Sequence, residues 1–168
     1  TFVGGEASGA ATWTVGDVID GAGGSDTFNI TSAGAVTVPT GATVSNIETI
    51  NVTAGATSTV FSSATGFSGL TALNVTGITA ITVTAGSSTA VAVTASTATG
   101  AVAVNGGSTV SVTETGATGT VTIGGTTAAA GAVTISSTGA TAGGSTGSAI
   151  TVTGGTTVTI TQIGGNAV

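Results

Sequence analysis

Six carboxylates are the only ionisable side chains in this sequence of 168 residues, which contains no Lys, Arg, His, Cys or Tyr. Three of them, Asp17, Asp20 and Asp26, lie in one glycine-rich stretch, GDVIDGAGGSDTFNI, at residues 16–30. A chain without cationic side chains cannot clamp a phosphate bidentately, and a chain without histidine lacks the commonest catalytic base. Most enzyme chemistry is therefore excluded, and divalent cations are the natural counter-ions of the carboxylates.

Glycoside hydrolysis is a second chemistry open to carboxylates, because it uses a pair of them. Glu48 and Glu114 are the candidates for such a pair. They fall in separate strand-like units of the sequence, and no aromatic residue stands beside either of them to hold a sugar. We therefore expect that the protein is not an enzyme.

The overall charge limits the partners. The formal net charge is −6 and the isoelectric point is about 4.1, which predicts repulsion from nucleic acid and from anionic membrane surfaces. No segment approaches the roughly 20 consecutive apolar residues of a membrane helix, so we expect no membrane insertion. The chain opens without Met and without a basic signal-like segment, so we expect it to be a piece of a longer polypeptide.

A short unit recurs along the chain: an apolar residue, a small one and a second apolar one, followed by Thr, Ser or a glycine-containing break. This alternation is typical of half-buried β-strands, and the 30 glycines and single proline indicate many tight turns. The units lie at residues 50–52, 73–75, 81–83, 91–93, 102–104, 110–112, 121–123, 133–135, 150–152 and 158–160. An all-β fold follows.

The spacing of the units favours a parallel β-solenoid, either a β-roll or a β-helix. From Leu73 to Val112 the units start about 8, 10, 11 and 8 residues apart, so two units form a coil of roughly 18 or 19 residues. A β-sandwich is the alternative, because short strands at such intervals are its signature too. We divide the chain into an N-terminal cap or junction, residues 1–39, and a solenoid repeat region, residues 40–168.

The unit spacing lengthens at two places, where we expect loops. These are residues 58–68 and residues 139–147. Phe61 and Phe67, in the first of them, are expected to form a small plug over the core.

The acidic stretch contains two copies of a short pattern. Asp17 and Ile19 recur as Asp26 and Phe28 at a nonapeptide interval, and the second copy follows a glycine-rich turn, GAGGSDTF, at residues 21–28. This pattern resembles the nonapeptide repeat G-G-x-G-x-D-x-U-x of RTX proteins. In that family, the carbonyl and carboxylate oxygens of the turn hold Ca²⁺.

The resemblance implies a set of calcium ligands in this chain. Gly21, Gly23 and Asp26 would bind the ion from the better copy, Asp17 would do so from the weaker one, and Asp20 would help to complete the site. The stacked partner expected in an RTX roll, one coil of about 18 residues beyond Asp26, is Val44, so a repeated calcium ladder is excluded. The alternative is that these aspartates only accept backbone N–H bonds in turns.

A wider resemblance covers most of the chain. Phrases such as NIETINV at residues 46–52 and LTALNV at residues 70–75, within a Thr, Ala, Gly and Val tract, resemble the β-solenoid surface-layer proteins secreted by the type I route in Gram-negative bacteria. The resemblance implies an extracellular protein at the cell surface that self-assembles into a calcium-dependent sheet or fibre. Its partners would be further copies of itself, calcium ions and cell-surface polysaccharide.

The last strand unit supports assembly independently. Solenoids normally block their terminal strand edges with charge, proline or a cap. Residues 157–163, TVTITQI, contain none of these. The expected assembly edge consists of Thr157, Val158, Thr159, Ile160 and Thr161, and it would pair either with another subunit or with the next domain of the same chain.

Two alternative functions come from the surface pattern, namely an adhesin module and an ice-binding module. Repeated Thr-x-Thr pairs resemble the ice-binding faces of β-solenoid antifreeze proteins, which need threonines stacked in one outward file over successive coils. Thr82 is followed about one coil later by Ala103 and Ser111, which breaks that file. The threonines are then explained by β-propensity alone.

Overall fold

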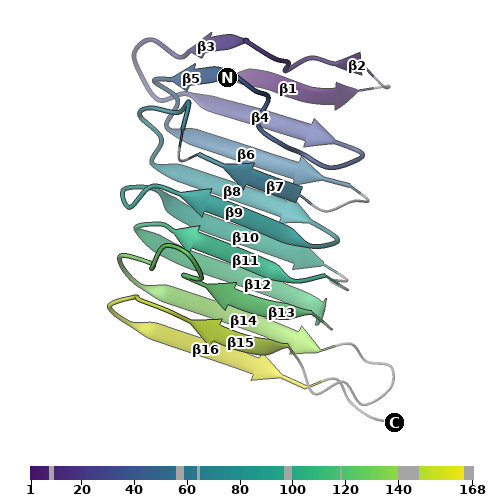
Figure 1. The fold of residues 1–168 in the computed structure, drawn as a ribbon, viewed down its shortest axis with the longest axis vertical. Coiled ribbons are helices and arrows are strands. Elements are labelled where there is room, and N and C mark those ends of the chain that lie inside the picture. Colours follow the sequence, from purple (N-terminus) through teal and green to yellow (C-terminus); the bar gives the residue numbers. More distant parts are fainter. Residues whose placement is uncertain are drawn as a thin grey trace.

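The computed structural model describes residues 1–7, 10–55, 59–63, 65–96, 100–117, 119–139 and 148–164. Over these residues the protein is all-β, and parallel strands stack into a β-solenoid of about six turns (Figure 1). The predicted fold class is therefore confirmed, and the β-sandwich alternative is wrong. All ten predicted strand units lie within strands.

Two large sheets form the body of the solenoid, and their strands run in opposite directions in Figure 1, except that β2 is antiparallel to its neighbour β1. The nine-stranded sheet comprises, in spatial order, β16 (Val158–Ile163), β14 (Val133–Gly139), β12 (Thr109–Ala117), β10 (Ala90–Ser96), β8 (Ala72–Gly77), β6 (Thr49–Ala54), β4 (Thr27–Ser32), β1 (Phe2–Ala7) and β2 (Ala10–Ala11). The five-stranded sheet comprises β15 (Ala149–Val152), β13 (Thr120–Ile123), β11 (Val102–Gly106), β9 (Ile81–Ala85) and β7 (Thr59–Ser62). In a third sheet, β3 (Val18–Asp20) pairs with β5 (Thr43–Ser45).

The core is a thin layer of Val, Ile and Leu between the two large sheets. In β8 and β10, as in most strands, apolar residues point inward and polar ones outward, as the period of two requires. Leu73 pairs with Val91, and Val91 pairs with Val110, so these two coils have the length that the unit spacing predicts. Each coil thus covers the apolar side chains of the coil before it.

The coils near the N-terminus have a third side and are therefore longer than the coils between Leu73 and Val110. Phe28 pairs with Ile50, and Ile50 pairs with Leu73, across these longer coils. The additional residues form the β3–β5 ladder, which a bridge between Val44 and Phe67 extends by one further coil. The strands of residues 1–39 other than β3 join the same nine-stranded sheet as the later ones, and the predicted division at residue 39 stays a prediction.

The aromatic side chains fill the wider N-terminal coils. Phe61 is completely buried, and its ring lies 5.6 Å from that of Phe67 and 6.4 Å from that of Trp13. The loop predicted at residues 58–68 is wrong in part, because residues 59–62 form β7 and Phe61 belongs to the core. Of the second predicted loop, residues 140–147 lie outside the described residues.

Candidate functional site at the acidic turn and the open edge

The acidic stretch forms the turn that leads from β3 into β4. Its shape requires glycine at Gly21, because a Cβ atom there would lie 2.0 Å from the carbonyl oxygen of Asn46 in the adjacent coil. Ala22 has φ of 59° and Gly24 has φ of 119°, a backbone conformation that favours glycine. The glycine-rich composition of the turn therefore follows from close stacking and from the left-handed backbone.

Asp17 and Asp20 stabilise the turn locally. Oδ2 of Asp17 accepts hydrogen bonds from the backbone N–H and the hydroxyl of Thr14, at 2.7 and 3.2 Å. Oδ1 of Asp20 accepts one from the N–H of Ala22, at 2.9 Å, and one from the amide of Asn46, at 2.8 Å. The Ala22 bond first, and then the Asn46 bond, lower the pKa of Asp20 below its ordinary value.

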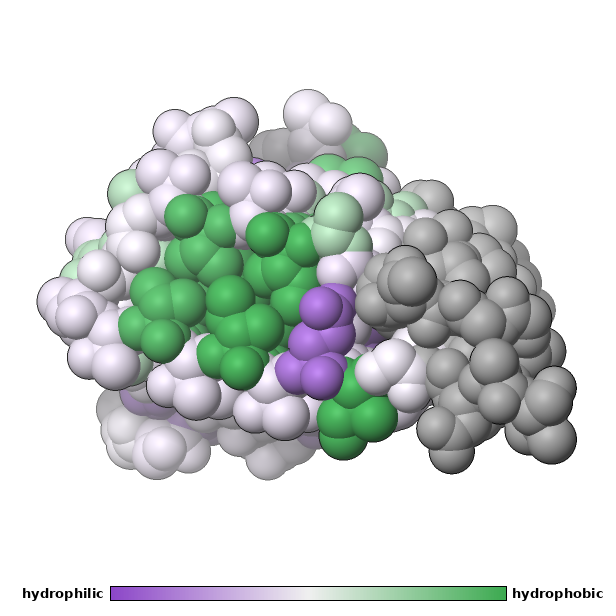
Figure 2. Space-filling view, turned by 90° about the horizontal axis from the view of Figure 1, so that it is seen from below, coloured by the Kyte–Doolittle hydropathy of each residue, from purple (hydrophilic) through white to green (hydrophobic). Residues whose placement is uncertain are grey.

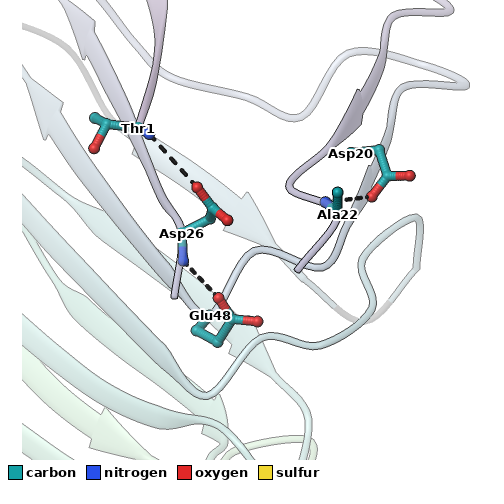
Figure 3. A network of polar contacts seen from close by, with 5 residues as sticks. All are labelled: Thr1, Asp20, Ala22, Asp26 and Glu48. Carbon is teal, nitrogen blue, oxygen red and sulfur yellow. Dashed lines mark hydrogen bonds and ion pairs between the residues drawn. The ribbon is translucent and has the colours of Figure 1, made fainter. Parts of the chain in front are cut away.

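Asp26 lies apart from Asp20; its carboxylate points toward Thr1, and its backbone N–H points toward Glu48 of the next coil (Figure 3). Its backbone N–H donates a 2.7 Å hydrogen bond to Oε2 of Glu48, and its carbonyl oxygen accepts from the N–H groups of Glu48 and Thr49. Oδ1 of Asp26 also lies 3.5 Å from the amino group of Thr1. Two acidic residues from successive coils therefore lie next to each other, just before the first residues of β4 and β6.

Glu48 was not predicted as the stacked partner of Asp26. A two-sided coil would align Asp26 with Val44, whereas the three-sided coil here aligns it with Glu48, further along the chain. A signal was present in the sequence, because DTFNIT at residues 26–31, ETINVT at residues 48–53 and TALNVT at residues 71–76 align without gaps. Their registers in β4, β6 and β8 match that alignment.

The predicted calcium ligands are therefore divided among separate contacts. Asp17 bonds to Thr14, Asp20 bonds to Ala22 and Asn46, and Asp26 faces Glu48. Within the described part of the chain, no group of three or more acidic side chains is placed to hold a metal ion together. Asp17 and Asp20 act as hydrogen-bond acceptors that stabilise turns, and calcium binding through Asp17, Asp20, Gly21, Gly23 and Asp26 stays a prediction.

At the last described coil, apolar side chains of β16 that continue the core are not covered by a further coil. All six residues of β16 are exposed, and Val158 and Ile160 retain 45% and 47% of their accessible surface. Their partners one coil earlier, Val133 and Ile135, retain 1% and 0%. Seen from this end, apolar side chains gather at the centre of the face (Figure 2). The predicted assembly edge, residues 157–161, is therefore exposed over the part that lies in β16.

Glu114 is the buried acidic residue of the described chain. It lies in β12 and is 0% exposed, and Oε2 accepts hydrogen bonds from the hydroxyls of Ser148 and Ser137, at 2.8 and 3.1 Å. Oε1 is also buried and has no hydrogen-bond partner among the residues that the structure describes. Glu48 precedes β6, three strands from β12, and its neighbour Thr49 is in register with Thr109, five residues before Glu114. At the usual strand spacing and rise, the backbone positions of the two glutamates are therefore roughly 24 Å apart. The two glutamates do not form a catalytic pair.

No known protein-family model matches this sequence, and no curated protein is significantly similar to it. The described residues contain no helix that is long and apolar enough to cross a membrane.

Proposed function

We propose that this chain is an extracellular structural module that self-assembles at the cell surface into a calcium-dependent layer or fibre. The observation that carries the proposal is the open section through the core at β16. In the preceding coils the equivalent Val and Ile side chains are covered by the next coil, which removes them from water. A further β-coil stacked on this end, from a second copy or from the same polypeptide, would cover Val158 and Ile160 in the same way and would pair the edge of β16.

The distribution of charge supports assembly through this end. Asp17, Asp20, Asp26 and Glu48 all precede β6, at the opposite end of the solenoid from β16. The strands at the open end contain no acidic residue. A second copy can therefore approach β16 without direct repulsion between carboxylates.

The resemblance to RTX turns supports a role for calcium at the acidic end. Asp26 and Glu48 are the pair best placed to share an ion, because they come from successive coils and their backbones are in contact. Aspartate and glutamate oxygens are the ligands that Ca²⁺ prefers, and carbonyl oxygens of Gly21 and Gly23 would add to them. Calcium would relieve the repulsion between acidic ends and so allow a second contact between subunits.

Electron microscopy of the purified chain in millimolar calcium, after chelation with EGTA and after restoration of calcium, tests the proposal. We expect ordered sheets or filaments that disappear on chelation and return with calcium. Ile160→Lys should prevent assembly because it places a charge in the open core. Thr161→Lys, on the outward side of the same strand, is the matched control and should assemble. Material that stays monomeric under every condition would exclude self-assembly as the function.

A further inference from the structure

The outward face of the nine-stranded sheet contains an unbroken file of hydroxyl side chains. The pairing register of β4, β6, β8, β10, β12, β14 and β16 stacks them directly, one in each strand. The file consists of Thr31, Thr53, Thr76, Thr94, Thr113, Ser136 and Thr161. All of these side chains are exposed except Ser136, which is partly exposed.

This file corrects the sequence-based conclusion that the threonines do not stack in one outward file. Thr82 lies in β9 of the five-stranded sheet, where it pairs with Val60 and Ala103, so a file is indeed broken there. Ser111, however, lies in β12 of the other sheet and does not stack on Thr82. The interruption applies to the five-stranded sheet alone, and the nine-stranded sheet was not tested by it.

A second file runs beside the first, two positions earlier in each strand. It begins with Asn29, Asn51 and Asn74; the side-chain amides of Asn51 and Asn74 each donate a 2.8 Å hydrogen bond to Oδ1 of the asparagine one coil earlier. It continues through Ala92, Ser111, Thr134 and Thr159. In a parallel sheet the two files are about 6.6 Å apart along the strands, and successive members are about 4.8 Å apart across them. The face is thus a regular two-dimensional array.

The array is rigid and uncharged. Threonine is β-branched and has few rotamers, and the continuous ladder fixes the backbone, so little side-chain freedom remains to be lost on binding. The outward side chains of β4 to β16 include no ionisable group, although the chain has a net charge of −6. Asp17, Asp26 and Glu48 lie outside the strands, Asp20 ends β3 in the third sheet, and Glu114 points into the core. Because this face carries no ionisable side chain, it favours an uncharged partner.

Aromatic side chains distinguish between two uncharged partners. A polysaccharide is usually held by an exposed aromatic ring, which this face lacks, since Trp13, Phe28 and Phe61 are buried and Phe67 packs against them. Ice is a rigid, repeating array of water molecules that donate and accept hydrogen bonds, and a hydroxyl group can do both. We propose that the Thr31-to-Thr161 face of the nine-stranded sheet binds ice.

Thermal hysteresis and the shape of single ice crystals, measured on the whole chain, test this inference. The wild-type chain should lower the freezing point below the melting point and should facet the crystals. Thr76→Tyr places a ring at the centre of the file and should abolish both effects. Thr82→Tyr, at an outward position of the five-stranded sheet, is the matched control and should retain both. Circular dichroism establishes that each variant is folded.

Three results would overturn the inference. The first is a folded wild-type chain that shows neither hysteresis nor faceting, and the second is an equal loss of activity in both variants. The third is retention on an insoluble polysaccharide that depends on Thr76 without any effect on ice. These results can be read apart from calcium-dependent assembly, because the hydroxyl file shares only Thr161 with the predicted assembly edge and the tested position, Thr76, lies in β8.

Discussion

Glu48 lies directly beneath Asp26, one coil further along the solenoid, and Oε2 of Glu48 accepts a 2.7 Å hydrogen bond from the backbone N–H of Asp26. The same two residues also contact through the carbonyl oxygen of Asp26 and the N–H of Glu48, at 3.2 Å. A glutamate in one coil thus satisfies a backbone donor in the turn of the coil before it. The acidic stretch is stabilised by this contact between coils as well as by its own local turns.

Replacing Glu48 tests the strength of that contact. Glu48→Ala leaves the partly buried N–H of Asp26 without its acceptor, and we expect a loss of about 1.5–3 kcal/mol in the free energy of unfolding. Glu48→Gln retains an acceptor oxygen and should lose less. Urea denaturation in EGTA measures both values without interference from calcium. Equal losses in the two variants would show that charge, and not the hydrogen bond, matters at this position.

Asp20 should make stability depend on acid pH. The hydrogen bonds from Ala22 and Asn46 lower its pKa in the folded chain, so the unfolded chain binds the proton more readily. The stabilisation is fully present above the ordinary aspartate pKa of about 4 and is lost as the pH falls through the lower folded value. Melting temperatures between about pH 6 and pH 2 should fall less steeply for Asp20→Asn than for the wild type. Parallel curves would contradict this assignment.

Close stacking of coils predicts that some glycines cannot be replaced. A Cβ atom on Gly106 would lie 2.1 Å from the carbonyl oxygen of Ala85 in the adjacent coil, and its φ of +77° is also unfavourable for other residues. Gly106→Ala should therefore cost about 2–4 kcal/mol of stability. Gly86→Ala is the matched control, because the nearest atom would be the Thr89 hydroxyl at 3.9 Å, and it should stay within about 0.5 kcal/mol of the wild type in denaturant unfolding. Similar losses for both would indicate a general effect of removing glycine.

The strands that were predicted from the sequence share one property. Each has two β-branched or leucine side chains separated by a small residue, and the structure buries those two side chains or leaves them at the open end. β7 escaped prediction because one of its inward positions is Thr59, which is buried although polar. β4 carries the expected pattern in Phe28, Asn29 and Ile30, but Phe28 was assigned to the RTX-like stretch at residues 21–28 and this unit was not counted among the strand units. The alternation of apolar and small residues was thus sufficient to predict strands where the inward side chains are all aliphatic.

The candidate sites depended on the length of the coil, which the strand pattern did not determine. A two-sided coil would align Asp26 with Val44, whereas the third ladder between β3 and β5 lengthens the coil and aligns Asp26 with Glu48. The hydroxyl file could not be predicted for the same reason, because its members are separated by unequal intervals along the chain. Variable turns change the sequence spacing without changing the register of the strands.

Glu114 provides the last prediction, because its carboxylate connects the two sheets inside the C-terminal coils. Oε2 accepts from Ser148, just before β15, and from Ser137 in β14, while Oε1 has no partner in the described part of the chain. Ser148→Ala removes one of the two donors and should cost about 1–3 kcal/mol. Glu114→Leu replaces the carboxyl group with an apolar side chain of similar size and so removes both buried carboxyl oxygens.

A double-mutant cycle separates the contact from the effects of each substitution. In the Glu114→Leu background, the Ser148 hydroxyl has already lost this acceptor, so Ser148→Ala should cost much less than in the wild type. The coupling energy between the two positions, measured by urea denaturation, should be about 1 kcal/mol or more. Ser136→Ala, on the outward side of β14, is the control and should be additive with Glu114→Leu. If the Ser148 and Glu114 changes are also additive, their hydrogen bond contributes nothing to stability, and the small size of serine alone explains its presence beside the core.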